Sequence, residues 1–322
     1  MGKNEKPKMV VLGGGTGMPV LLRGLKKLPI DLSTIVTVAD DGGSTGMLRK
    51  ENKMLPAPGD IRNVISALAN VDSELMELFQ HRFKANNGLV GHSLGNIVLA
   101  AMNSITGNFY EAVEQVSKML NVQGKIYPIV NESITLHAEM EDGTIVSGES
   151  HIPMKNKKIK RVFLTPNHLK PLPEAIEAIL TTDLVVISPG SLYTSILPNL
   201  IINDVIDAIR NTKAKVVYVC NIMTQNGETN DYTAADHVKA IYNHIGPNTI
   251  DTIVVHNKPI PHYILKKYVK QHSSPVQVDV DQLLKLKLEI IAEDIIDYSK
   301  PVIRHNTEKL SSILYHMVSQ KL

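Results

Sequence analysis

The sequence of 322 residues contains no tryptophan, and aromatic residues make up only 4% of it. Proteins that bind single-stranded nucleic acids stack bases on aromatic side chains, so this scarcity argues against such a surface. Lysine plus arginine outnumber aspartate plus glutamate by 34 to 32, which gives a formal net charge of +2. A chain this close to neutral is not typical of proteins that bind nucleic acids or membrane surfaces. Any anion must therefore be bound by a local arrangement of residues.

The chain has a single cysteine, Cys220, so no disulfide can form within it. This suits a reducing cytoplasm. Cys220 ends the apolar run 216–219, which predicts a buried position in a strand rather than a catalytic thiol. No apolar run reaches the length of a membrane span, and residues 1–8 are polar with no signal core after them. We expect a soluble cytoplasmic protein without membrane insertion.

The most informative stretch is the apolar segment 9–12, which runs into a glycine cluster and then into a helical pattern from Met18. A strand, a glycine turn and a helix in this order place free N–H groups and the positive end of a helix dipole over one spot. We therefore expect Gly13, Gly14, Gly15, Thr16 and Gly17 to bind phosphate. The dinucleotide pattern is imperfect, since its third glycine position holds Met18, and the ending of an ATPase P-loop is absent. The alternative is a tight turn that binds nothing.

Two acids, Asp40 and Asp41, follow a β-branched segment that we expect to form a strand over 33–39. A Rossmann-type unit holds its ribose-binding carboxylate at this place. The glycines that follow predict a flexible, donor-rich loop over 42–46, with Gly42, Gly43 and Ser44 near the ligand. Plain turn chemistry is the alternative.

A rigid turn over 56–59 precedes Asp60, which we expect to cap a helix over 61–69. Arg62 and Asn63 would lie in the first turn of that helix, where a cation opposes the dipole and gains nothing locally. This favours a ligand role for Arg62, with Asn63 beside it.

Residues 91–95 contain the pattern Gly-x-Ser-x-Gly, which marks the nucleophile of some hydrolases when a strand leads directly into it. Here a helix predicted over 72–84 and a polar loop precede it. We therefore favour a glycine turn opening a helix over 94–104, with His92, Ser93 and Asn96 facing the site. A packed, satisfied His92 is the alternative.

Strands and helices alternate through the rest of the chain, which predicts a doubly wound, mostly parallel Rossmann-like α/β sheet. Asp-Gly at 142–143 between alternating segments predicts a β-hairpin. We expect one elaborated domain over 1–322 with an antiparallel insertion at about 125–165. Later strands are expected at 183–187, 215–220 and 250–255, with short ones at 276–280 and 288–291. A helix should run from Thr233 to Gly246, and a terminal one from about 306 to 317, within a C-terminal portion of about 275–322.

The strand over 183–187 runs into a second turn, 188–191, that opens a helix over 192–200, as at the start of the chain. Ser188, Gly190 and Ser191 are therefore a second candidate anion site. Asn221 follows the strand over 215–220, and Arg304 precedes the terminal helix. All these groups fall at the carboxyl ends of predicted strands, where such sheets bind ligands.

Several of these motifs together resemble a known family, namely 13–17 with 21–25, 38–46, 58–63, 91–96, 188–191 and Arg304-His305. They are similar to the YvcK-type gluconeogenesis factors of bacteria, relatives of the 2-phospho-L-lactate transferase CofD. The transferase transfers a phospholactyl group from a guanosine diphospho donor to a deazaflavin alcohol, with magnesium. It has a Pro-Asp-x-Asp-Thr segment where this chain has 58–63, which favours the gluconeogenesis-factor branch.

That branch is associated with carbon metabolism, cell shape, envelope synthesis and the binding of UDP-sugars. The resemblance thus implies a regulatory factor that binds a nucleotide diphosphate, with a UDP-sugar as the expected ligand. The second hypothesis is a magnesium-dependent transferase acting on a nucleotide-diphosphate ester. In it, Asp40, Asp41 or Asp60 would be catalytic, with Asp40 and Asp41 as the magnesium ligands.

Both hypotheses share one set of binding residues and leave the oligomeric state open, a homo-oligomer included. Thr307, which follows Arg304-His305-Asn306 and opens a helix, is a candidate target for a protein kinase. Capping of the helix by Thr307 or Asn306 is the simpler interpretation.

Overall fold

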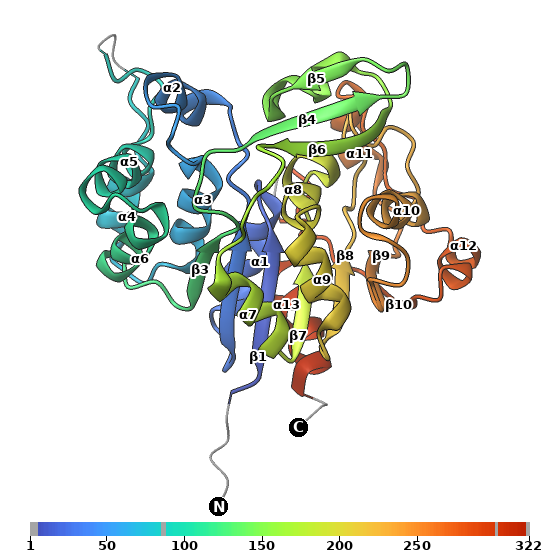
Figure 1. Ribbon diagram of the computed structural model, residues 1–322. Helices are drawn as coiled ribbons and strands as arrows, with labels where there is room; N and C mark the ends of the chain where they lie inside the picture. The colour runs from blue at the N-terminus through green and yellow to red at the C-terminus, as the bar shows by residue number, and fades with distance from the viewer. Residues whose placement is uncertain (1–5, 85–87, 300–301, 320–322) are drawn as a thin grey trace, which may run out of the picture.

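The computed structural model describes residues 6–84, 88–299 and 302–319. Its centre is a sheet of seven parallel strands in the order β10-β9-β8-β7-β1-β2-β3, which confirms the predicted α/β class (Figure 1). The strands are β1 (Lys8–Gly13), β2 (Asp31–Val36), β3 (Lys125–Pro128), β7 (Leu184–Ile187), β8 (Lys215–Val219), β9 (Thr252–His256) and β10 (Glu289–Glu293).

Strand β1 lies in the interior of this sheet, between β2 and β7. Its residues Met9, Val10, Val11 and Leu12 are at most 1% exposed, as expected of a parallel strand covered on both faces. The chain builds outward from β1 through β2 to β3, and then returns to build outward on the other side from β7 to β10. The strand order therefore reverses between β1 and β7. Sheets of this kind bind ligands in the crevice at that point.

Thirteen α-helices pack around the sheet in the described part of the chain (Figure 1). Those in the first half are α1 (Gly17–Leu25), α2 (Gly43–Glu51), α3 (Pro58–Leu68), α4 (Ser73–Gln80), α5 (Leu94–Thr106) and α6 (Phe109–Met119). Those in the second half are α7 (Pro173–Thr181), α8 (Leu197–Leu200), α9 (Asn203–Asn211), α10 (Ala234–Ile245), α11 (His262–Val269), α12 (Val280–Lys285) and α13 (Thr307–Ser319). Within the described ranges, none is long and apolar enough to cross a bilayer.

A second, antiparallel sheet consists of β4 (Thr135–Met140), β5 (Ile145–Ser147) and β6 (Ile159–Thr165), with β4 in the middle. The predicted hairpin turn is present, with Gly143 at φ +81° and the Asp142 carboxylate accepting from the Thr144 N–H. Segment 125–128 is β3 of the main sheet, so the insertion begins later than predicted. This sheet lies over the top of the molecule in Figure 1, between the α2 side and the α10 side.

Two turns of 3-10 helix, η1 (Glu149–His151) and η2 (Pro153–Lys155), connect β5 to β6. The Val162 N–H donates to His244 Nε2 of α10 at 3.0 Å, which ties β6 to the main body. The basic residues of β6 are exposed, and Lys160 and Arg161 both pair with Glu139 on β4. They form the solvent-exposed face of an edge strand, where charged side chains discourage pairing with another chain.

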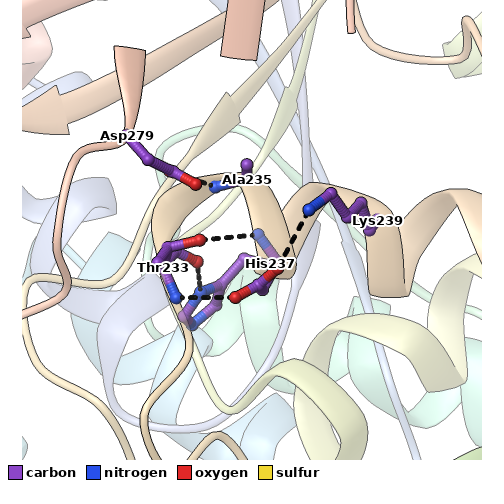
Figure 2. Close-up of polar contacts among 6 residues, drawn as sticks. Thr233, Ala235, His237, Lys239 and Asp279 are labelled. Atoms are coloured by element: carbon purple, nitrogen blue, oxygen red, sulfur yellow. Dashed lines mark hydrogen bonds and ion pairs between the residues drawn. The ribbon is translucent and has the colours of Figure 1, made fainter. Parts of the chain in front are cut away.

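Helix α10 confirms the predicted cap at Thr233 and the predicted end at Gly246. The Thr233 hydroxyl accepts from the Asp236 N–H and the Asp236 carboxylate accepts from the Thr233 N–H, both at 3.2 Å. Asp279 accepts from the Ala235 N–H at 3.0 Å, as Figure 2 shows. Segment 276–280 thus docks on the start of a helix, so the strand predicted there is wrong.

Other predicted boundaries are wrong for local reasons. Residues 43–51 form α2, where a flexible loop was predicted over 42–46, because Gly42 occupies the N-cap position. Helix α3 begins at Pro58, a residue that suits the first turn, so Asp60 lies inside the helix and does not cap it. Helix α4 ends at Gln80, short of the predicted 84.

Candidate functional site

The glycine turn after β1 is packed against the turn after β7. A Cβ on Gly17 would lie 2.3 Å from the Pro189 carbonyl oxygen, so only glycine allows the two backbones to approach this closely. Gly15 has φ +64°, a left-handed conformation that also favours glycine. The predicted phosphate loop is therefore one wall of the crevice at the point of strand reversal.

The first N–H groups of α1 point out of this turn. Thr16 is the N-cap, but its side chain makes no capping hydrogen bond, and the first turn contains no acidic residue. The first N–H groups of a helix have no partner within the helix, so an uncapped start is open to an anion.

Two buried polar side chains lie against the glycine turn after β1. Asn199 on α8 donates from Nδ2 to the Gly13 carbonyl at 3.0 Å and to the Ser195 carbonyl at 2.9 Å. Ser188 is 0% exposed, and its hydroxyl has no hydrogen-bond partner in the described part of the chain. A Cβ on Gly13 would lie 2.0 Å from this hydroxyl, so Ser188 lies directly against the glycine turn.

A pocket of about 490 Å³ opens at this crevice. Of the residues predicted from the sequence, it brings together Thr16, Gly17, Gly190, Ser191, Asn221 and Arg304. Asn221 closes the turn after β7, since its side chain accepts from the Gly190 N–H and donates to the Gly190 carbonyl. Arg304 is exposed at the rim, so its guanidinium is free to meet a ligand.

The far side of the pocket comes from residues that sequence reasoning missed. They lie after β8, on α11 and in the segment before α13, and include Met223, Thr224, Gln225, Tyr268, Gln271 and Ile303. The Ile303 N–H donates to the Tyr268 hydroxyl, which links two of these segments. The position of Met223, Thr224 and Gln225 just after a strand could have indicated that they line the site. No local sequence pattern marks Tyr268 or Gln271.

Carboxylates gather on the other side of the glycine turn. Asp60 Oδ2 accepts from the Gly15 N–H at 2.8 Å, so this N–H is directed at a side chain of the protein. Burial raises the pKa of Asp60 to about 6, and the negative charge of Asp40 adds to the rise. Asp40 in turn accepts from the Gly42 N–H at 2.8 Å. Both carboxylates are therefore held by backbone N–H groups of glycine turns, and the charge of Asp40 acts on Asp60.

Asp41 is bonded to the connection between β5 and β6. Its carboxylate accepts from the Ser150 N–H at 2.9 Å, and a Cβ on Gly148 would lie 2.5 Å from its second oxygen. The connection η1 is thereby docked on the segment between β2 and α2, and it brings Glu149 close to the acids. Burial raises the pKa of Glu149 to about 8, with Asp40, Asp60, Glu228 and Asp41 adding to it.

Glu228 completes this acidic group and is 4% exposed. It accepts from the Tyr193 N–H at 3.1 Å and the Thr194 hydroxyl at 2.9 Å, which anchors the π-helical turn η3 (Leu192–Ile196). Burial raises the pKa of Glu228 to about 7. Neither Glu149 nor Glu228 stands near a sequence motif, so sequence reasoning missed both.

Polar residues from the three predicted segments at 42–44, 62–63 and 91–96 do meet, but they bind one another. The Ser44 hydroxyl, 3% exposed, accepts from the Ser93 N–H and from Asn96 Nδ2, and lies 3.4 Å from His92 Nδ1. Arg62 lies in the second turn of α3, because the helix begins at Pro58. It donates to the Ser93 hydroxyl at 3.1 Å and to Asn63 Oδ1 at 2.7 Å.

In the described residues before Ser93, 88–92, the chain forms turns and no strand, so the strand-to-turn geometry of a hydrolase nucleophile is not seen there. Cys220 is buried, and burial raises the pKa of its thiol to about 12, in keeping with a packing role.

At the start of α13 the N-cap is Asn306, whose Oδ1 accepts from the Lys309 N–H. The Thr307 hydroxyl donates to the Val20 carbonyl of α1. Among the described residues, no three His, Cys, Asp or Glu side chains converge as a metal site.

Comparison with known proteins identifies the family of this chain. The family model described as 2-phospho-L-lactate transferase CofD matches residues 9–296. This chain belongs to the CofD family. It is 54% identical to the gluconeogenesis factor of Bacillus subtilis strain 168 over 316 residues, covering 98% of this chain and 99% of that protein. It is 44% identical to the gluconeogenesis factor of Listeria monocytogenes over 318 residues, covering 99% and 98%.

A solved structure of a CofD-family relative confirms the fold. The crystal structure of a Bacillus halodurans protein matches this chain with a TM-score of 0.94 and 54% identity, covering 96% of this chain and 99% of that one. The predicted membership of the gluconeogenesis-factor branch is confirmed by the relatives above, which match over almost their whole length.

Proposed function

We propose that the chain is a regulatory factor of gluconeogenic carbon metabolism and cell-envelope morphogenesis that binds a nucleotide diphosphate, in particular a UDP-sugar. The observation that carries the proposal is the uncapped start of α1 beside the pocket at the reversal point between β1 and β7. The names of the similar gluconeogenesis factors support the metabolic role.

The diphosphate fits at the start of α1, where the N–H groups of the first turn and the helix dipole favour negative charge. Ser191 supplies a hydroxyl from the facing turn, and Arg304 supplies the positive charge at the rim. The Arg62 guanidinium already donates hydrogen bonds to Ser93 and Asn63, so Arg304 is the better partner for the phosphates.

The pocket then extends from the phosphates toward Thr224, Gln271 and Ser273. Gln271 is exposed and presents an amide, which can recognise a base or a sugar by hydrogen bonds. The Thr224 and Ser273 hydroxyls are bonded within the wall and hold it in shape. Asp40, in the segment that follows β2, remains the candidate for a ribose or sugar hydroxyl.

Calorimetric titration with a UDP-amino sugar tests the proposal. We expect saturable binding that Arg304→Gln weakens by about tenfold or more, because a charge-assisted hydrogen bond contributes about 1.5–3 kcal/mol. Arg23→Gln is the matched control, since Arg23 is exposed on α1 and does not line the pocket. Equal affinity of both variants and the unchanged protein would overturn the proposed pose.

A second candidate function is a magnesium-dependent transfer from a nucleotide-diphosphate ester, favoured by the acids Asp40 and Asp60. The charge of Asp40 contributes to the raised pKa of the buried Asp60 carboxylate, and magnesium is usually held by one or two carboxylates plus substrate oxygens. Asp41 is the poorer ligand, because it is bonded to Ser150. Magnesium would neutralise charge on the diphosphate, while Asp60 or Glu149 would accept a proton from an acceptor hydroxyl.

Turnover separates the two candidates. Consumption of a nucleotide-diphosphate ester with magnesium and an acceptor alcohol, lost in Asp40→Asn while nucleotide binding in EDTA is kept, would support the transferase. Tight binding with no consumption of donor would support the regulatory function.

A further inference from the structure

A second hollow lies far from the crevice, over the amino-terminal halves of the first three strands. It measures about 790 Å³ and opens between α6 and α7, which flank β3 and β1 in Figure 1. Its floor comes from β1, β2 and β3, including Val10 and Ser33. The proposed function leaves this groove without a role.

Two tyrosines form the inner wall of this groove. The rings of Tyr110 on α6 and Tyr127 on β3 lie 5.9 Å apart between centroids, tilted by 48°. The Tyr110 hydroxyl donates to Glu114 Oε1 at 3.3 Å, which holds this side chain at the groove. Tyr127 is 7% exposed, so it forms part of the wall with most of its surface packed.

The charged residues around these rings differ in how far they are buried. Glu174, in the first turn of α7, is half-buried, whereas the other charged residues of the groove are exposed at its rim. In residues 6–84, 88–299 and 302–319, the Glu174 side chain has neither an ion pair nor a hydrogen bond. Glu174 lines the same groove as Tyr110 and Tyr127. Burial raises the pKa of both tyrosines, and the charge of Glu174 contributes to both.

A buried hydroxyl completes the wall. Ser117 of α6 lines the groove, and its Oγ is buried without a hydrogen-bond partner among the described residues. A buried polar atom without a partner costs free energy unless a ligand or water satisfies it. A hydroxyl oxygen accepts readily from an N–H donor.

We propose that this groove binds a small organic amine, with its ammonium group between the tyrosine rings and the Glu174 carboxylate. Aromatic faces attract an ammonium through their quadrupole, and an unpaired, half-buried carboxylate supplies the opposite charge. The lysines at the rim are exposed and hydrated, so they do not make the inner wall attractive to an anion. This site is independent of the nucleotide pocket.

Titration with putrescine tests the proposal, with 1,4-butanediol as the neutral probe of the same length. The chain has no tryptophan, so tyrosine fluorescence reports binding alongside calorimetry. We expect saturable binding of putrescine only, weakened about tenfold by Glu174→Gln and by Tyr110→Leu, and restored by Tyr110→Phe. Glu111→Gln is the matched control, because Glu111 is an exposed first-turn acid of α6 outside the groove.

Circular dichroism establishes that each variant is folded. The proposal is overturned if putrescine shows no saturable binding at millimolar concentration, or if Glu174→Gln binds it as well as the unchanged protein does. Loss of binding in Asp40→Asn with retention in Glu174→Gln would place the amine at the acids of the crevice and would equally overturn it.

Discussion

Replacing Glu149 by glutamine should stabilise the protein in alkaline solution. Burial and the surrounding carboxylates raise the pKa of Glu149 from its ordinary value of 4.5 to about 8. Well below pH 4.5 the Glu149 carboxyl is protonated in both the folded and the unfolded chain. Between pH 4.5 and pH 8 the folded chain retains a proton that the unfolded chain releases, so the free energy of unfolding falls as the pH rises.

The magnitude follows from the size of the shift. One pKa unit corresponds to 1.36 kcal/mol, so a shift from 4.5 to about 8 sets an upper limit of about 5 kcal/mol. Glu149 is partly exposed, and solvent screening reduces this figure. We expect Glu149→Gln to raise the free energy of unfolding by about 1–3 kcal/mol at pH 8.5 and by much less at pH 5.

Urea denaturation at both pH values, in EDTA to keep the carboxylates free of metal, measures the difference. Glu141→Gln is the control, since Glu141 is exposed in the same insertion. If Glu149→Gln changed the free energy of unfolding by the same amount at both pH values, the idea that burial and the neighbouring acids raise the pKa of Glu149 would be refuted.

Other predictions concern the glycine turn. Gly17→Ala should cost at least about 2 kcal/mol of unfolding free energy, because its Cβ would lie 2.3 Å from the Pro189 backbone oxygen; a loss below 0.5 kcal/mol in urea denaturation would contradict the close approach. Asn199→Ala should cost about 1–3 kcal/mol by leaving the buried Gly13 and Ser195 carbonyls without their donor. Hydrogen exchange that is unchanged around the glycine turn in Asn199→Ala would show that Asn199 does not support the turn.

The central part of the fold was predictable because its signals are local. The apolar run of β1, the glycines after it and Gly246 at the end of α10 each determine their own conformation. Strand ends in a parallel sheet all meet at one edge, so the general location of the site followed from the order of the elements.

The details of the site depended on contacts between distant segments. Asp60 was predicted to cap its own helix, but it accepts from Gly15, 45 residues earlier in the chain. Ser44 was predicted to face a ligand, but it is buried against Ser93 and Asn96. Glu149 reaches the acids only because η1 docks on Asp41, and no local pattern records that docking.

The most direct test of the account is the affinity for a UDP-sugar measured by calorimetry in EDTA, for the unchanged protein and for Arg304→Gln. The account predicts one saturable site per chain, about tenfold or more weaker in Arg304→Gln and unchanged in Arg23→Gln. Absence of saturable binding to the unchanged protein would contradict the proposal that the crevice between β1 and β7 is a nucleotide-diphosphate site.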